Sequence, residues 1–208
     1  MPLSDKVTAT RGHIVMAPGL YNHDRVAFVR STLPSHIFVH GHGAVITYSG
    51  SFLTLDATKP MTLRDITFGS GTSVALRTSP FVFESVTFAN AKVLRVSSGS
   101  LQARHLTISE MTDAAGAIQV DATGELTIDG GSIVGGTIGI VATAPGARFH
   151  LKNLLISRTT GRALELAQGQ GELEFSTIAG SGAQTTSAPC AVSCSSLLNV
   201  RSSIIWQT

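Results

Sequence analysis

The residues best suited to chemistry near the start of the chain are histidines. Five of the seven histidines lie within the first 42 residues, and they are His13, His23, His36, His40 and His42. If stacked strands bring His13 beside His36, and strand alternation turns His36 and His40 to one face, the imidazoles have a spacing that suits Zn²⁺ or Cu²⁺. Solvated surface histidines give the same pattern without a ligand. The sequence therefore makes His13, His36 and His40 candidates for a metal site and predicts no other cofactor.

Two cysteines form the next pair of reactive residues. Cys190 and Cys194 lie four residues apart in the segment APCAVSC. In an oxidising compartment they can form a local disulfide, and the alternative is that they remain two unrelated thiols. Two sulfurs alone are too few ligands for a zinc site, which takes four.

Cleavage of a glycan depends on the number and spacing of carboxylate side chains. Glycoside hydrolysis needs two carboxyl groups flanking the bond, and calcium-dependent elimination needs several carboxylates around one ion. Asp56 and Asp121 fall at equivalent positions three repeats apart, about 14 Å when repeats stack as strands, so they cannot share an ion. The longest irregular segment, Gly180 to Cys194, contains no acid or base. We therefore expect no catalytic residue in this chain.

A repeat of about twenty residues positions these side chains. The pieces MTLRDITFGSG, FVFESVTFANA and LQARHLTI, within residues 61–108, superpose at a spacing of twenty residues. Self-similarity at a fixed period marks a repeat architecture, in which each unit buries its apolar face only by stacking on its neighbours. The many Gly, Ser, Thr, Val and Ile residues, and a charged fraction of only 13%, favour short strands joined by turns.

Extending the repeat in both directions predicts nine rungs. Apolar residues alternate with polar residues in each rung, which places two inward positions on one face of a strand. The first inward position of successive rungs is Ile14, Ile37, Met61, Phe81, Leu101, Leu126, Phe149, Leu173 and Leu198. The second inward position is Met16, Val39, Leu63, Phe83, Ala103, Ile128, Leu151, Phe175 and Val200.

Each coil is expected to contain three short strands. A second strand follows a two-residue corner, and a third strand precedes the inward pair, at 53–55, 74–76, 94–96, 118–120, 138–140 and 164–166. Three strands in a coil of about 23 residues define a parallel β-helix. We therefore predict an all-β fold in which residues 1–208 form one domain, a single-stranded right-handed parallel β-helix of about nine rungs.

One outward position carries charges whose sign alternates from rung to rung. The column reads Ala17, His40, Arg64, Glu84, Arg104, Asp129, Lys152, Ser176 and Arg201. A neighbouring column reads Glu125, Arg148 and Glu172. Rungs stack roughly 4.8 Å apart, so opposite charges on successive rungs attract and like charges repel. We interpret the column as a structural ladder that fixes the register, rather than as a binding surface.

Several segments carry a family resemblance: IVMAPGLYNHD at 14–24, the LTLRDITF-type coils, GELEFSTIAGSG and VRSSIIWQT. They resemble the right-handed parallel β-helix superfamily typified by pectate lyases, the pectin lyase-like group, and within it bacterial secreted or surface β-helix repeat proteins. The resemblance implies the fold but no single function, because the group includes lyases, hydrolases, adhesins and phage tail parts. HGHG at 40–43 resembles the Gly-His-Gly of polygalacturonases, but the adjacent aspartates and Arg-x-Lys that accompany it there are absent.

Charge and hydropathy limit the expected partners. The formal net charge is +2 and no run of five basic residues occurs, so we expect no binding to nucleic acid. No apolar run reaches membrane-spanning length, and the opening MPLSDKVTATRGHIV does not read as a signal peptide, so we expect no insertion into a membrane. Either the protein is cytosolic, or the chain is a mature piece from which a targeting signal has been removed. The resemblance implies the second case, an extracellular or cell-surface protein whose signal peptide is not in this chain.

The two ends of the predicted β-helix lack caps. About ten residues without helical periodicity precede the first rung, whereas family members usually begin with a capping helix, and SSIIWQT stops in a strand. Open strand edges are templates for further strands. We therefore expect the chain to be part of a longer protein or to associate end to end with another copy.

Two classes of function remain open. The favoured one is a non-enzymatic module of a bacterial exported or cell-surface protein, used for structure, adhesion, or contact with glycans or other surface proteins. The alternative is a carbohydrate-active polysaccharide lyase or glycoside hydrolase whose catalytic groups lie in loops. Carboxylates that converge on one outer face would favour the enzyme, and the predicted register contains no such convergence.

Overall fold

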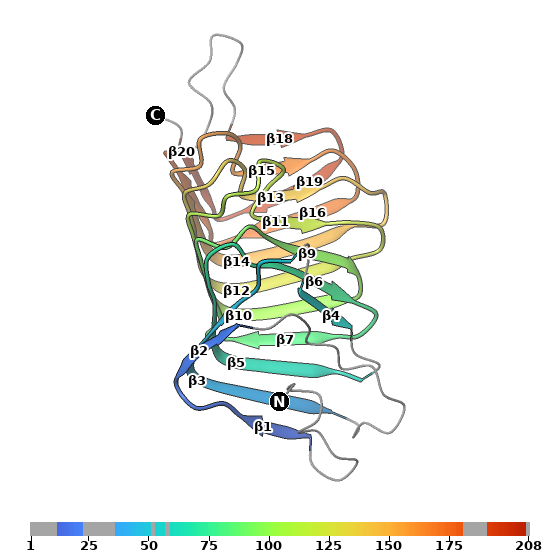
Figure 1. Cartoon of the computed structure of the whole chain (residues 1–208). Helices are drawn as coiled ribbons and strands as arrows, with labels where there is room; N and C mark the ends of the chain where they lie inside the picture. The colour runs from blue at the N-terminus through green and yellow to red at the C-terminus, as the bar shows by residue number, and fades with distance from the viewer. Residues whose placement is uncertain (1–11, 23–35, 51–52, 57–58, 181–190, 207–208) are drawn as a thin grey trace.

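The computed structural model describes residues 12–22, 36–50, 53–56, 59–180 and 191–206. Every regular element in this part of the chain is a β-strand, and all strand pairs are parallel (Figure 1). The long sheet contains β1 (His13–Val15), β2 (Gly19–Asn22), β3 (Ile37–Thr47), β5 (Met61–Phe68), β7 (Phe81–Glu84), β8 (Thr87–Ala89), β10 (Ser100–Ser109), β12 (Glu125–Val134), β14 (Arg148–Ser157), β16 (Gln170–Glu174), β17 (Thr177–Ala179), β19 (Leu197–Arg201) and β20 (Ile204–Trp206). The second sheet contains β4 (Leu53–Asp56), β6 (Ser73–Arg77), β9 (Val93–Ser98), β11 (Ile118–Val120), β13 (Ile140–Ala142), β15 (Leu164–Leu166) and β18 (Val192–Cys194).

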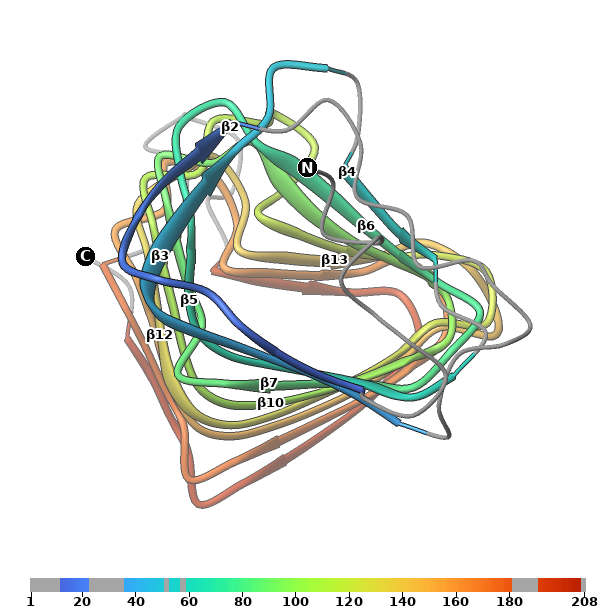
Figure 2. The ribbon, with the colours of Figure 1, turned by 60° about the horizontal axis from the view of Figure 1, so that its bottom comes forward.

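The two sheets stack coil upon coil into a parallel β-solenoid, which confirms the predicted all-β fold. Viewed from its end, the coils overlie one another around a common interior (Figure 2). Nine strands stack along the main path of the long sheet, from β1 to β19, as the nine predicted rungs require. Only seven strands stack in the second sheet, so the described residues complete about seven turns.

From β5 to β19, a residue with positive φ turns the corner within each coil of the long sheet. Six of these corner residues are not glycine, although such residues rarely adopt the left-handed conformation. Asp, Asn and His tolerate it best, because their short polar side chains can bond to the local backbone. The corner residues are Asp65 (φ 51°), Ser85 (φ 54°), His105 (φ 55°), Gly130 (φ 81°), Asn153 (φ 52°), Phe175 (φ 47°) and Ser202 (φ 45°). Because successive coils bend at equivalent positions, their strands before and after the corner stack in register.

The interior is filled by inward side chains of both sheets: two inner rows of the long sheet, the inward residues that follow its corners, and the inward residues of the second sheet. Phe81 and Phe83 are completely buried, and the rings of Phe68 and Phe88 stack with centroids 4.9 Å apart. Burial of one such side chain stabilises the fold by about 1.5–3 kcal/mol. The predicted inner rows are confirmed from Ile37 to Phe149 and from Val39 to Leu151, strand by strand.

The predicted register is wrong by two residues in the first rung. Ile14 pairs with Val39 rather than Ile37, so His13 lies opposite Phe38 and Val15 lies opposite His40. A shift of two residues keeps every side chain on the same face, so alternation of apolar and polar residues cannot detect it.

The eighth rung is also displaced by two residues. Phe149 pairs with Gly171 rather than Leu173, and Leu173 takes the second inner row beside Leu151. The ring of Phe149 occupies the space that a Cβ atom on Gly171 would need, so any larger residue here would force the ring to move. Phe175, predicted to point inward, is the corner residue and is 58% exposed.

The corrected register lengthens the alternating column, here called the charge row. Val15 replaces Ala17 at its start, and Glu174 replaces Ser176 between Lys152 and Arg201. The charge row therefore alternates in sign over seven successive strands: Arg64, Glu84, Arg104, Asp129, Lys152, Glu174 and Arg201. In the neighbouring column, Gln170 rather than Glu172 lies opposite Arg148.

Candidate functional site

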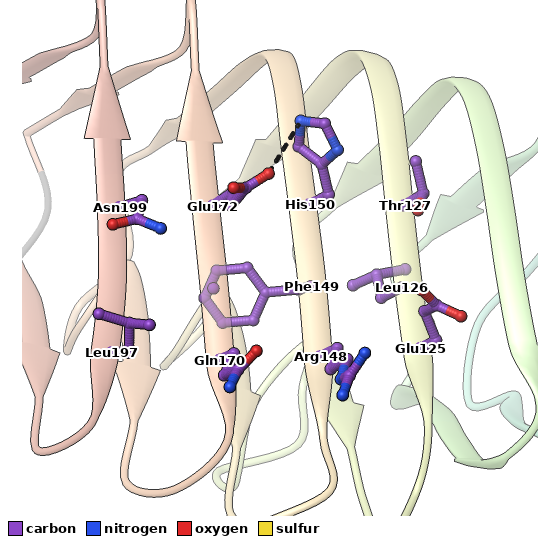
Figure 3. Close-up of a pocket in the computed structure, with 11 residues that line it drawn as sticks. Glu125, Leu126, Thr127, Arg148, Phe149, His150, Gln170, Glu172, Leu197 and Asn199 are labelled. Carbon is purple, nitrogen blue, oxygen red and sulfur yellow. Dashed lines mark ion pairs between the residues drawn. The ribbon is translucent and has the colours of Figure 1, made fainter.

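A shallow hollow of about 290 Å³, the polar groove, crosses the outer face of the long sheet near its C-terminal end. Strands β12, β14, β16 and β19 carry it, and alternation along each strand directs two residues outward (Figure 3). One row consists of Glu125, Arg148, Gln170 and Leu197. The second row consists of Thr127, His150, Glu172 and Asn199. The backbone of the intervening residues Leu126, Phe149 and Gly171 separates the rows.

A basic side chain lies opposite a carboxylate on the adjacent strand at two places in the polar groove. Glu125 lies opposite Arg148 on the adjacent strand, and His150 lies opposite Glu172. The groove thus offers carboxylate and amide acceptors together with guanidinium and amide donors, with little net charge. Such a lining suits a polar ligand that both donates and accepts hydrogen bonds.

His150 faces two carboxylates. Its Nε2 atom lies 3.8 Å from Oε2 of Glu172 and 3.5 Å from Oε2 of Glu174, and it makes no hydrogen bond although the atom itself is buried. Glu174 also lies 3.7 Å from the guanidinium of Arg201. Figure 3 shows the imidazole leaning toward Glu172 at the edge of the polar groove.

The convergence of two carboxylates and a histidine was missed by the sequence analysis. The predicted register placed Glu172 beside Arg148 and excluded Glu174 from the charge row, and both errors come from the shifted eighth rung. Glu172 and Glu174 are two residues apart, so alternation along a strand places both carboxylates on one face. This spacing is the feature of the sequence that could have predicted the paired carboxylates.

A second hollow of about 450 Å³, the aromatic groove, lies on the same outer face near the N-terminal end. Its lining comes from β1, β3, β5 and β7: His13, Phe38, Val39, His40, Thr62, Arg64 and Glu84. The ring of Phe38 stacks on that of His36 with centroids 4.3 Å apart, and His13 meets Phe38 edge-on at 6.2 Å. This groove is therefore built around an exposed ring.

The three histidines proposed as metal ligands have different partners. The predicted stacking of His13 on His36 is wrong, because Phe38 rather than His36 lies opposite His13 on the adjacent strand. Nε2 of His36 lies 2.9 Å from Oγ1 of Thr62, and Nε2 of His40 lies 2.8 Å from Oδ2 of Asp65. Among the described residues, no three His, Cys, Asp or Glu side chains gather as metal ligands, and His23 lies outside them.

The remaining sequence candidates that the structure describes lie apart from both grooves. Cys194 is exposed at the end of β18, with its sulfur 2.8 Å from the carbonyl oxygen of Ser196. Cys190 lies outside the described residues, so the disulfide stays a prediction. Asp56 ends β4, and Asp121 directly follows β11, which lies three strands away in the second sheet, as predicted. The carboxylate of Asp121 forms an ion pair with Arg95 at 3.1 Å.

No protein-family model, curated protein or solved structure matches this chain. Within the described residues, no helix is long and apolar enough to cross a membrane.

Proposed function

We propose that the chain is a non-enzymatic β-solenoid module of a bacterial exported or cell-surface protein, and that it contacts glycans through the polar groove. The observation that supports this proposal is the lining of the groove, which combines amide, carboxylate, guanidinium and imidazole groups on an open face. The resemblance of its coils to bacterial surface β-helix repeats supports the location.

The chemistry of the polar groove fits an uncharged or weakly charged glycan. Sugar hydroxyls both donate and accept hydrogen bonds, and the groove presents both kinds of partner. Glu125 and Glu172 offset the charge of Arg148, so the groove has no excess of positive charge to attract a polyanion. Four strands give the groove a length of about 14 Å, enough for a short stretch of an extended polymer.

The alternative is a polysaccharide lyase or glycoside hydrolase, and one observation favours it. His150 with Glu172 and Glu174 provides groups that can exchange a proton at the edge of the groove. However, both carboxylates come from one strand and face the same imidazole, whereas hydrolysis requires carboxyl groups on opposite sides of the bond. Only Glu172 of the two lines the groove. The arrangement is therefore better suited to contact than to turnover.

Two glutamines on the same face test the proposal. Gln170 lines the polar groove, while Gln102 lies exposed on β10 outside it, in the same row as His150 and Glu172. Binding of neutral and acidic oligosaccharides is measured by calorimetry. Gln170→Ala should weaken binding of the recognised glycan by about two- to tenfold, the value of one hydrogen bond, and Gln102→Ala should leave it unchanged. Equal effects of the two substitutions would contradict the assignment of the groove.

Turnover assays distinguish the two classes of function. We expect no product from polygalacturonate, alginate or other acidic glycans, with or without calcium. Turnover that survives repurification and is abolished by Glu172→Gln would overturn the non-enzymatic proposal in favour of the enzyme.

A further inference from the structure

The aromatic groove, which the proposed glycan contact does not use, contains a ring that breaks the pattern of the sheet. Phe38 is 47% exposed, although its strand β3 is paired on both sides, with β1 and β5. Its exposure therefore follows from the outward direction of the side chain rather than from a free edge. At the equivalent position, the following strands place small or polar residues, namely Thr62, Val82, Gln102, Thr127, His150, Glu172 and Asn199. A large exposed aromatic residue at such a position contributes little to the fold and marks a candidate binding site.

The ring of Phe38 is held in a fixed orientation. His36 stacks on it with centroids 4.3 Å apart and planes at 21°, and His13 meets it edge-on at 6.2 Å. Nε2 of His36 in turn lies 2.9 Å from Oγ1 of Thr62, a residue that is itself buried. A ring supported in this way loses little freedom when a ligand covers it, so the entropic cost of binding is low.

Polar side chains line the aromatic groove beside this ring. His40, Arg64 and Glu84 lie opposite one another on successive strands of the charge row. Nε2 of His40 and Nε of Arg64 lie 2.8 Å and 3.4 Å from the same oxygen, Oδ2 of Asp65. These contacts orient the imidazole and the guanidinium, and the carboxylate of Glu84 adds an acceptor. The groove therefore combines an apolar ring with a margin of hydrogen-bonding groups.

A sugar ring matches this combination of groups. The C–H groups on a face of a sugar ring are weakly positive, and they are attracted to the negative face of an aromatic ring. The hydroxyl groups at the edge of the sugar both donate and accept hydrogen bonds, as Arg64 and Glu84 require. These two side chains offset each other's charge, so the groove gives an anionic ligand no advantage. At about 450 Å³, the groove lies in the size range of small-molecule sites.

We propose that the aromatic groove is a second glycan site, in which the C–H face of an uncharged sugar ring stacks on Phe38 and the sugar hydroxyls bond to Arg64 and Glu84. Strand β10 separates the strands of this groove, β1, β3, β5 and β7, from those of the polar groove, β12, β14, β16 and β19. The two sites share no residue, so either can fail without the other. Because both open on the outer face of the long sheet, the protein can hold a long glycan at two places.

The test measures whether a sugar stacks on the ring of Phe38. Binding of the neutral trisaccharides cellotriose, xylotriose and mannotriose is followed by calorimetry and by ¹H NMR of the sugar. At least one trisaccharide should bind, with upfield shifts of the C–H protons on one face, because these protons lie over an aromatic ring. Phe38→Leu removes the ring but keeps an apolar side chain, so it should weaken binding about three- to tenfold and abolish the shifts. Phe38→Trp retains an aromatic ring and should keep both.

Phe175 provides the matched control. It is also an exposed phenylalanine of the long sheet, and it lines neither groove, so Phe175→Leu should leave binding and the shifts unchanged. Both positions are exposed, so unchanged unfolding midpoints should verify that the variants fold. Equal effects of Phe38→Leu and Phe175→Leu, or no binding of any of the three trisaccharides, would overturn the proposal. Binding that is weakened by Gln170→Ala but not by Phe38→Leu would also overturn it, and would leave the polar groove as the glycan site.

Discussion

The middle and the C-terminal end of this solenoid have similar sequences but different environments. Phe83 and Val200 occupy the same inner row of the long sheet, yet Phe83 is 0% exposed and Val200 is 45% exposed. β7 lies between β5 and β10, whereas β19 has β16 as its single neighbour in the described part of the chain. Burial of Phe83 is therefore supplied by the coils on either side, and the same apolar pattern stabilises the middle more than the C-terminal end.

Truncation of inner side chains should show the largest difference between middle and end. Phe83→Ala and Leu151→Ala should each lower the free energy of unfolding by about 2–5 kcal/mol, because they leave cavities between packed coils. Val200→Ala should cost less than about 1 kcal/mol, because its side chain is half exposed and its surroundings can relax. Urea unfolding at constant protein concentration measures all three. Equal costs in the middle and at the end would contradict the comparison.

A substitution at Gly171 tests the register between β14 and β16, next to the C-terminal end of the solenoid. Gly171→Ala should destabilise the protein by about 1–3 kcal/mol, because the new Cβ atom would overlap the ring of Phe149. Phe149→Leu frees part of this space, so the double variant should lose less stability than the sum of the single variants. A neutral effect of Gly171→Ala would mean that Leu173, as the apolar pattern suggested, occupies the first inner row.

Charge reversal in the charge row should give the smallest effect. Glu84→Lys would place positive charge on three successive strands beside Arg64 and Arg104, and it should destabilise by at most about 1 kcal/mol at low salt. Added salt should reduce the loss, because it screens repulsion between exposed charges. Glu84→Gln is the control that removes attraction without adding repulsion. Loss of stability that is independent of salt would show that these side chains do not face one another.

The fold could be predicted because its determinants are local and repeated. In residues 61–108, each coil repeats the same alternation at a constant spacing, so the register of Met61, Phe81 and Leu101 follows from the sequence alone. At the eighth rung the first inner position is Gly171, which an apolar pattern cannot identify. The glycine is explained only by the ring of Phe149, a side chain 22 residues earlier in the chain.

The candidate site was less predictable than the fold, because it depends on the register between strands rather than on the pattern within each strand. A groove across four strands depends on which residues lie opposite one another, so a shift of two residues in one strand changes its composition. The true register brings Glu172 beside His150 and Glu174 beside Lys152. The predicted stacking of His13 on His36 was wrong for the same reason, because the shifted first rung places Phe38 opposite His13.

The most direct test of the central claim is to map a bound glycan on the ¹⁵N-labelled protein by NMR. The account predicts saturable shifts of backbone amides in 125–127, 148–150 and 170–172, no shifts in the second sheet, and a glycan that stays intact throughout the titration. Shifts confined to the second sheet, or cleavage of the glycan during the titration, would contradict it.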